Sequence, residues 1–249
     1  MRYKRVLLKL SGAALAGGDK TTTFNQKAID HITGEVLSLT DIGVQVVMVV
    51  GGGNIFRGNL ASQWSIEQAE ADNMGMLGTI INGVLMRAVL ESKGVDVRLT
   101  TALPTPAVAE PYIRLRAIGH LEKGRLVICS GGMGQPFVTT DYPAVQRALE
   151  TRCDAVLVAK NGVDGIYNAD PRIDEDARRY TTLSTEQALR EDLRAMDQQA
   201  LILARDHQLP VHVFDFDKGG IARRLCLGED VGTLVTSGVS STLAPKGES

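Results

Sequence analysis

The sequence feature that most constrains the fold is an apolar run that ends in glycine, and it occurs three times. The runs span residues 5–10, 44–50 and 125–129, and they lead into Ser11-Gly12, Gly51-Gly52-Gly53 and Ser130-Gly131-Gly132. Strands buried on both faces of a parallel sheet are apolar throughout, and their carboxyl ends lie along one edge. The three glycine loops are therefore predicted to share one side of a parallel sheet.

Helical patterns separate these runs. Apolar residues recur at helical spacing in two segments, at Ile29, Ile32, Val36 and Leu39 and then at Leu77, Ile81, Val84 and Ala88. Further strands are expected at 155–159, 211–214 and 233–235. Alternation of this kind predicts an α/β fold of right-handed βαβ units. One domain over residues 1–239 is expected, with a frayed polar tail over 240–249.

Composition excludes several classes of protein. The 249 residues carry a formal charge of −2, which provides no bulk attraction to nucleic acid or to an acidic membrane. The cysteines Cys129, Cys153 and Cys226 are widely spaced among apolar residues, which favours buried reduced thiols over disulfides or a metal site. No leader-like segment and no run of eighteen apolar residues is present, so a cytoplasmic protein is expected.

Lys9 stands two residues before the first glycine loop. An ammonium beside outward-facing backbone amides suits phosphate oxygens, although this is not a Walker loop. An ordinary strand end with a lysine that reaches water is an equally good interpretation.

The triple glycine is followed by Asn54 and, one helical turn on, by Arg57. Three consecutive glycines indicate that the backbone passes very close to something. A ligand is favoured, and a tight turn packed on the protein itself is the alternative. Arg57 could offer a bidentate fork to a phosphate, or it could be a surface arginine.

The third glycine loop runs into Thr139, Thr140, Asp141 and Pro143. These residues are helix-start signals, and a helix start at a glycine loop is also an anion site, so ligand binding is slightly favoured. Residues 161–171 indicate either a flap that presents Tyr167 to an aromatic ring or a plain hairpin. Considered alone, Asp72 and Asp197 are best explained as stabilising helix N-termini.

The four histidines are scattered, and the sequence contains neither a catalytic triad nor clustered metal ligands. A strand-borne lysine, glycine loops and a few aspartates are the parts that phosphoryl transfer by positioning and electrostatics requires.

Considered together, the motif blocks resemble bacterial UMP kinases, which are members of the amino-acid-kinase family. The match runs from about residue 4 to about residue 236 and rests on these blocks: Leu8-Lys9-Leu10-Ser11-Gly12, Gly51 to Gly58, Asp72-Asn73-Met74-Gly75-Met76, Gly134 to Asp141, Val163 to Pro171, and Met196-Asp197. Lysine followed by Ser-Gly and the triple glycine occur across the wider family. The D-x-M-G-M and P-F-x-T-T-D blocks are typical of the UMP branch.

The resemblance implies a three-layer αβα sandwich with a mainly parallel sheet, assembled as a homohexamer. It also implies phosphoryl transfer from ATP with Mg²⁺ to UMP in pyrimidine biosynthesis, activation by GTP and inhibition by UTP. The residues assigned to ATP are Lys9, Leu10, Ser11, Gly12, Gly53, Arg57, Asn161, Tyr167 and Asp170. Those assigned to UMP are Gly52, Asp72, Met133, Gly134, Gln135, Pro136, Phe137, Val138, Thr139 and Thr140.

The resemblance also implies roles in catalysis. Lys9 is expected to neutralise the transferred group, Asp197 to orient Lys9, Arg57 to bridge the two nucleotides, and Asp141 to organise the environment of Lys9 and magnesium. No protein ligand set for a metal is assigned.

The chain departs from the family in three places. Ala13 replaces the usual glutamate, Met133 replaces a threonine, and residues 17–24 differ near the region that responds to GTP. Kinases of the same fold that form acyl phosphates are the nearest alternative enzymes, and they are disfavoured by the D-x-M-G-M block. A non-catalytic nucleotide sensor is disfavoured because Lys9, Arg57 and Asp197 are all present.

Overall fold

The computed structural model covers the whole chain and describes residues 1–19, 21–171, 173–193 and 196–245. The described strands form a single sheet in the order β10-β7-β9-β8-β6-β1-β2-β5-β3-β4. Their bounds are β1 Arg5–Leu10, β2 Gln45–Val50, β3 Val97–Thr101, β4 Glu110–Pro111, β5 Leu126–Ser130, β6 Ala155–Lys160, β7 Tyr180–Ser184, β8 Val211–Asp215, β9 Thr233–Thr236 and β10 Thr242–Leu243.

The sheet is mainly parallel, as predicted. Every neighbouring pair from β8 to β4 is parallel, whereas β9 runs antiparallel to β8 and β10 antiparallel to β7. The six strands expected from sequence all form within one or two residues of their predicted bounds. The carboxyl ends of β1, β2, β5 and β6 therefore meet at one edge, which places the three glycine loops together.

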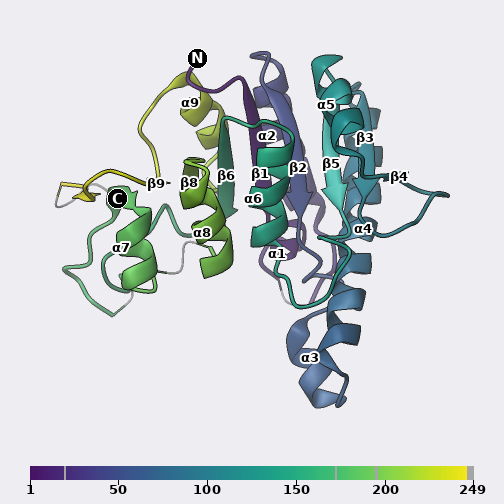
Figure 1. Ribbon diagram of the computed structural model, residues 1–249, viewed down its shortest axis with the longest axis horizontal. Coiled ribbons are helices and arrows are strands. Elements are labelled where there is room, and N and C mark those ends of the chain that lie inside the picture. The colour runs from purple at the N-terminus through teal and green to yellow at the C-terminus, as the bar shows by residue number, and fades with distance from the viewer. Residues whose placement is uncertain (20, 172, 194–195, 246–249) are drawn as a thin grey trace.

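Helices cover both faces of the sheet, which confirms the three-layer sandwich (Figure 1). One core contains the apolar faces of α1, α2, α4 and α9, and the other contains those of α5, α6, α7 and α8. Successive residues of β1 belong alternately to the two cores, because successive side chains of a strand point to opposite faces of the sheet. The helix bounds are α1 Gly12–Leu15, α2 Gln26–Thr40, α3 Gly58–Gln63, α4 Gln68–Ser92, α5 Arg114–Glu122, α6 Asp141–Glu150, α7 Thr185–Arg190, α8 Gln198–Asp206 and α9 Ile221–Leu227.

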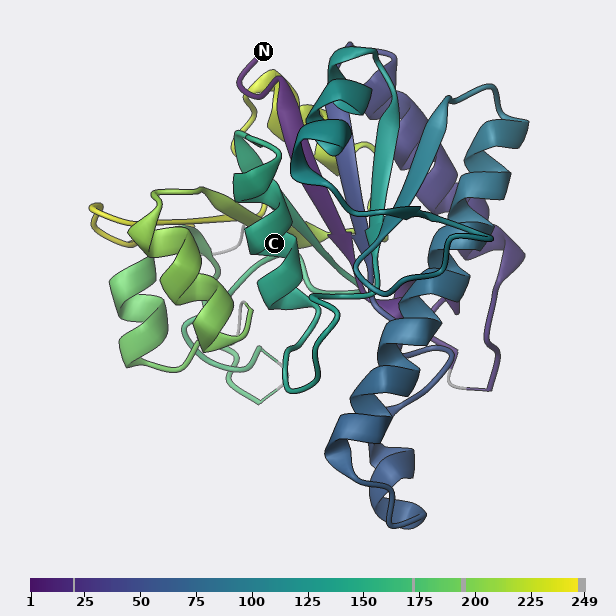
Figure 2. The same cartoon turned by 45° about the vertical axis from the view of Figure 1, so that its right-hand side comes forward.

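Helix α4 is long, and together with α3 its first half projects from the body of the molecule (Figure 2). It is the one helix in the described ranges that is long and apolar enough to cross a membrane, but 44% of that window is buried, as in a core helix. The buried residues include Met76, Ile80 and Met86, whereas Leu77 and Ile81 are exposed. The helix predicted from Leu77, Ile81, Val84 and Ala88 is confirmed by α4, but of these residues Val84 packs against the core and the other three are exposed.

The tail expected to fray from residue 240 is ordered for part of its length, so that expectation was wrong for residues 242–245. Strand β10 pairs with β7, and Ala244 is buried, with its amide donating to the carbonyl of Arg179 at 2.8 Å. The pairing of β10 with β7, the hydrogen bond of the Ala244 amide and the burial of Ala244 hold a segment whose polar composition suggested otherwise. Residues 246–249 lie outside the described ranges.

A buried histidine on β8 predicts acid sensitivity of the fold. His212 is 2% exposed and its Nε2 lies 2.8 Å from the hydroxyl of Tyr3. Burial, with a smaller effect from Arg2, lowers the pKa of His212 to about 4. Because the unfolded chain takes up this proton from about pH 6.5 downward and the folded chain does not, stability is lost as the pH falls from about 6.5 to about 4.

Because of His212, we expect the free energy of unfolding to be about 2 kcal/mol lower at about pH 5 than at about pH 7. Urea titrations of the wild type and of His212→Gln at both pH values measure this difference, since glutamine does not titrate. The variant should lose about 2 kcal/mol less than the wild type over this interval. Equal losses in the two proteins would exclude His212 as the source.

Candidate active site

Lys9 is the penultimate residue of β1 and lies beside the first turn of α6. Its Nζ lies 2.6 Å from Oδ1 of Asp141, and the two side chains are 10% and 17% exposed. A carboxylate fixed on a helix N-terminus holds the ammonium in one place at the edge of the sheet. The helix start predicted from Thr139, Thr140 and Asp141 is confirmed, with Thr140 as the N-cap residue of α6.

Asp197 lies one step further from Lys9. Its backbone amide donates to Oδ2 of Asp141 at 3.1 Å, its carboxylate accepts from the amide of Ala200 at 2.7 Å, and it also accepts from the Thr139 hydroxyl. The capping function inferred from sequence is thus confirmed. The orienting position beside Lys9 belongs to Asp141, through which Asp197 is connected to the lysine.

The triple-glycine loop is packed against other backbone on one side and open on the other. A Cβ atom added to Gly52 would lie 2.2 Å from the carbonyl oxygen of Gly75, and one on Gly12 would lie 2.6 Å from the amide nitrogen of Gly53. A Cβ on Gly53 would meet no described atom within 4 Å. Close packing against the protein is therefore confirmed for Gly52, whereas the approach of a ligand stays a prediction for Gly53, which faces open space.

A buried asparagine pair braces this loop from behind. Nδ2 of Asn82 donates to the carbonyl of Gly51 and to Oδ1 of Asn54, at 2.7 Å in both cases, and Nδ2 of Asn54 donates back to Oδ1 of Asn82 at 3.1 Å. Both amides are buried, so the network fixes the loop without solvent competition.

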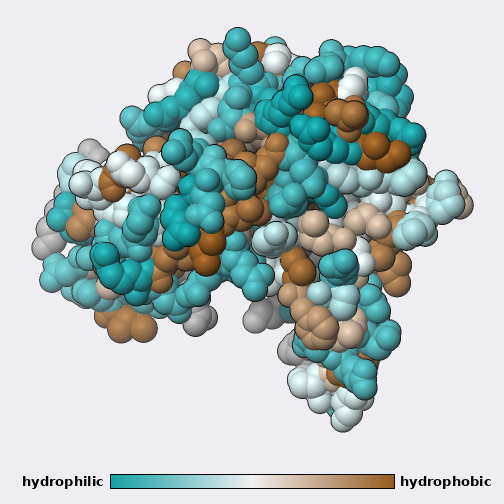
Figure 3. All heavy atoms as spheres, in the orientation of Figure 1, coloured by the Kyte–Doolittle hydropathy of each residue, from teal (hydrophilic) through white to brown (hydrophobic). Residues whose placement is uncertain are grey.

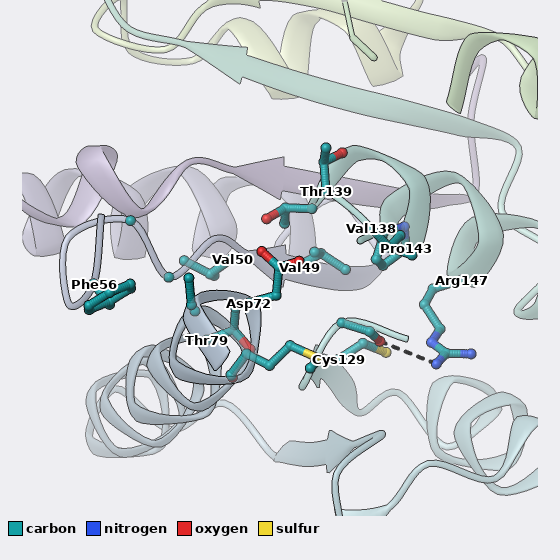
Figure 4. Close-up of a pocket in the computed structure, with 17 residues that line it drawn as sticks. Val49, Val50, Phe56, Asp72, Thr79, Cys129, Val138, Thr139, Pro143 and Arg147 are labelled. Atoms are coloured by element: carbon teal, nitrogen blue, oxygen red, sulfur yellow. Dashed lines mark hydrogen bonds between the residues drawn. The ribbon is translucent and has the colours of Figure 1, made fainter. Parts of the chain in front are cut away.

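Two adjoining cavities lie at this edge of the sheet. One, of about 370 Å³, is lined by the first two glycine loops with Lys9, Arg57 and Thr140. The other, of about 260 Å³, lies among α4, α6 and the loop after β5, and contains Asp72 (Figure 4). Gly52, Gly53 and Thr140 line both cavities. In the space-filling view the surface is hollowed between the projecting α3 and α4 and the lobe of α7 and α8 (Figure 3).

The loop after β5 is tied to α4 at two points. The amide of Gly131 donates to the Thr79 hydroxyl at 2.7 Å, and the amide of Phe137 donates to Oδ2 of Asp72 at 2.7 Å. Gly131 has a φ of 75°, a left-handed conformation that favours glycine, and an added Cβ would lie 2.6 Å from Oγ1 of Thr101. Asp72 lies inside α4 rather than at its N-terminus, so the capping explanation for Asp72 was wrong.

The structure brings together most of the residues expected at the site. The predicted ligand residues that line the two cavities are Lys9, Ser11, Gly12, Gly52, Gly53, Arg57, Asp72, Val138, Thr139 and Thr140. The others lie outside these two linings, although several belong to the same loops: Leu10, Met133, Gly134, Gln135, Pro136, Phe137, Asn161, Tyr167 and Asp170.

The segment that carries Tyr167 is not a hairpin closed on itself. Tyr167 forms an antiparallel bridge with Arg179, and its hydroxyl donates to Oδ1 of Asp164 at 2.8 Å. Burial, with the adjacent Asp164 carboxylate, raises the pKa of Tyr167 to about 12. Asn161 donates to Asp217 at 2.9 Å, so this segment is tied to the turn after β8.

Sequence reasoning missed two cations at the site. Lys160 is the last residue of β6 and Lys9 lies one residue before the end of β1; burial, with a smaller effect from Lys9, lowers the pKa of Lys160. Its position at a strand end was a signal that could have identified it. Arg147 on α6 lines the cavity that contains Asp72, and the sequence held no comparable signal for this helix residue.

Comparisons with known proteins agree with this geometry. Residues 4–215 match the profile of the amino acid kinase family. The chain is 52% identical over 235 residues to the uridylate kinase of Frankia alni, covering 94% of this chain and 91% of that protein, and 47% identical to that of Bifidobacterium adolescentis, covering 97% and 96%. The crystal structure of UMP kinase from Bacillus anthracis superposes with a TM-score of 0.96 at 54% identity, covering 98% and 100% of the two chains.

Proposed function

The chain belongs to the amino acid kinase family, among the uridylate kinases, and we propose that it transfers the terminal phosphoryl group of ATP to UMP, yielding ADP and UDP. The family and relatives named above supply the identity of the substrates. One observation carries the proposal to this chain: two cavities meet at Gly52, Gly53 and Thr140, with the Lys9 ammonium at the edge of one of them. Phosphoryl transfer needs two such adjacent sites with positive charge near their junction.

The proposed mechanism is in-line transfer promoted by position and charge. Lys9 neutralises the charge that develops on the transferred group, and Asp141 holds the ammonium in place at 2.6 Å. Arg57 bridges the two nucleotides from the start of α3. Asp197 supports this arrangement by capping α8 and binding Thr139. None of these side chains forms a covalent intermediate.

The acceptor is assigned to the cavity that contains Asp72, with this carboxylate accepting hydrogen bonds from the ribose hydroxyls. Gly52 and the residues Met133, Gly134, Gln135, Pro136, Phe137, Val138, Thr139 and Thr140 complete this side. The donor is assigned to the cavity of Lys9, with Leu10, Ser11, Gly12 and Gly53 at its phosphates and Asn161, Tyr167 and Asp170 toward its base.

Magnesium belongs to the proposal as part of the donor. In the described ranges no three His, Cys, Asp or Glu side chains form a metal cluster. Mg²⁺ in kinases is usually bound through ATP phosphates and water with one or two carboxylates, and Asp141 would be the carboxylate at hand here. Bound there, the ion neutralises phosphate charge.

Assembly and regulation form a further part of the proposal. A homohexamer is supported by the exposed stripe of Leu77 and Ile81, which are 50% and 47% exposed on α4, since exposed apolar faces commonly pair. Activation by GTP, inhibition by UTP, a role in pyrimidine biosynthesis and a cytoplasmic location belong to the proposal as what the resemblance to bacterial UMP kinases implies. Light scattering tests the assembly.

A coupled assay of ADP release across the nucleoside monophosphates, with ATP and Mg²⁺, tests the activity. UMP is expected to give a kcat/KM at least about 100-fold above that of AMP or GMP, because a pocket built to hydrogen-bond one base leaves buried groups unpaired with another. Addition of GTP or UTP to the same assay measures the effectors. Turnover of acetylglutamate, aspartate or carbamate in the absence of UMP turnover would overturn the proposal.

A further inference from the structure

The guanidinium of Arg147 is buried at the back of the cavity assigned to UMP, and the mechanism above does not use it. Arg147 projects from α6, and its side chain is 7% exposed. It lines the cavity beside Cys129, Gly132 and Pro143 (Figure 4). A buried cation needs partners that compensate for the loss of water, so its contacts indicate what it does.

Three groups surround the guanidinium. Its Cζ lies 3.8 Å from the centroid of the Tyr112 ring, and Nη1 lies 2.6 Å from Oε2 of Glu150. Nη2 donates to the carbonyl oxygen of Gly132 at 3.4 Å, the bond drawn as a dashed line in Figure 4. The ring and the carboxylate hold the planar fork in one orientation, which leaves Nη2 facing the loop.

This contact completes the attachment of the loop after β5. Gly131, Gly132 and Gly134 all have positive φ, so the segment has more conformations to lose than an ordinary loop. Thr79 and Asp72 hold it from α4, at Gly131 and Phe137. Arg147 holds it from the opposite side, from α6.

We propose that Arg147 is a positioning residue for the acceptor nucleotide, which acts by fixing the Gly132 carbonyl and so the course of the loop over residues 131–137. That the acceptor is UMP rests on the proposed function, whereas the expected effect of Arg147 on the order of the loop over residues 131–137 does not. Lysine at this position keeps the charge but lacks the fork, so it cannot hold Glu150 and Gly132 together.

Steady-state kinetics of Arg147→Lys test this role. We expect the KM for UMP to rise about tenfold or more, with kcat and the KM for ATP changed by less than about twofold, because the loop contacts the acceptor only. Arg5→Lys is the matched control: Arg5 begins β1, at the end of that strand away from Lys9, and donates to the carbonyl of Thr151, the C-cap residue of α6, at 2.6 Å, so this variant should leave every constant near the wild-type value.

Hydrogen exchange without nucleotide provides the second readout. Residues 131–137 should exchange at least about fivefold faster in Arg147→Lys than in the wild type or Arg5→Lys, and this holds whichever nucleotide is the substrate. Unchanged exchange together with an unchanged KM for UMP would overturn the proposal. If the lysine variant does not fold, Tyr112→Leu removes the ring below the guanidinium and is expected to show the same two changes.

Discussion

Replacing Lys9 with methionine is expected to lower kcat by about 1,000-fold while leaving the Kd for UMP within about a factor of two. The ammonium acts on charge that develops in the transition state, and the cavity assigned to UMP is lined by other residues. Rapid-quench measurement of UDP formation gives the first quantity, and calorimetric titration with UMP gives the second.

The effect of the Lys9 substitution on the stability of the fold has to be separated from its effect on phosphoryl transfer. Removal of Lys9 leaves the Asp141 carboxylate without the partner that lies 2.6 Å away, and breaking a buried pair costs about 3 kcal/mol. The double variant Lys9→Met with Asp141→Asn removes the unpaired charge, so its stability should recover while its activity does not. A double variant that regains wild-type turnover would exclude Lys9 from catalysis.

The strands that position the site could be predicted because they are buried on both faces. β1, β2, β5 and β6 are nearly continuous apolar runs, and each ends at the edge where the cavities lie. Strands β3, β4, β7 and β10 were missed. β3 and β7 mix Arg98, threonines and a serine with apolar residues, so neither a continuous run nor a clean alternation marks them, and β4 and β10 contain only two residues each.

Contacts between distant segments could not be predicted, because they depend on side-chain directions in three dimensions. The resemblance to UMP kinases assigned both Asp141 and Asp197 to the surroundings of Lys9, but the register of the helices decides that Asp141 forms the ion pair. Arg147 gave no signal, because an arginine on an amphipathic helix is usually solvated. Its burial follows from the position of Tyr112, which comes from a distant part of the chain.

The triple glycine shows how structure resolves an ambiguity that sequence leaves open. Close approach of the backbone to a ligand and to the protein itself both demand glycine, so the pattern alone cannot separate them. The surroundings of Gly52 and Gly53 differ: backbone of α4 lies against the first, and the second faces open space at the junction of the cavities. Packing against α4 therefore accounts for Gly52, and close approach of a ligand remains the prediction for Gly53.

Matched alanine substitutions separate these reasons. In Gly52→Ala the new methyl would lie 2.2 Å from the carbonyl oxygen of Gly75 and 3.0 Å from the amide nitrogen of Thr79, so the loop or α4 must move. We expect a loss of about 3 kcal/mol in unfolding free energy, together with a large fall in kcat/KM, because α4 carries Asp72. Urea titration and the coupled assay measure the two effects.

Gly53→Ala should instead leave the unfolding free energy within about 0.5 kcal/mol of the wild type, since the methyl meets no described atom within 4 Å. It projects where the two cavities join, so it should raise KM while the fold stays intact. Equal losses of stability in the two variants would mean that both glycines are packed against the protein, and the junction would then have to be placed elsewhere.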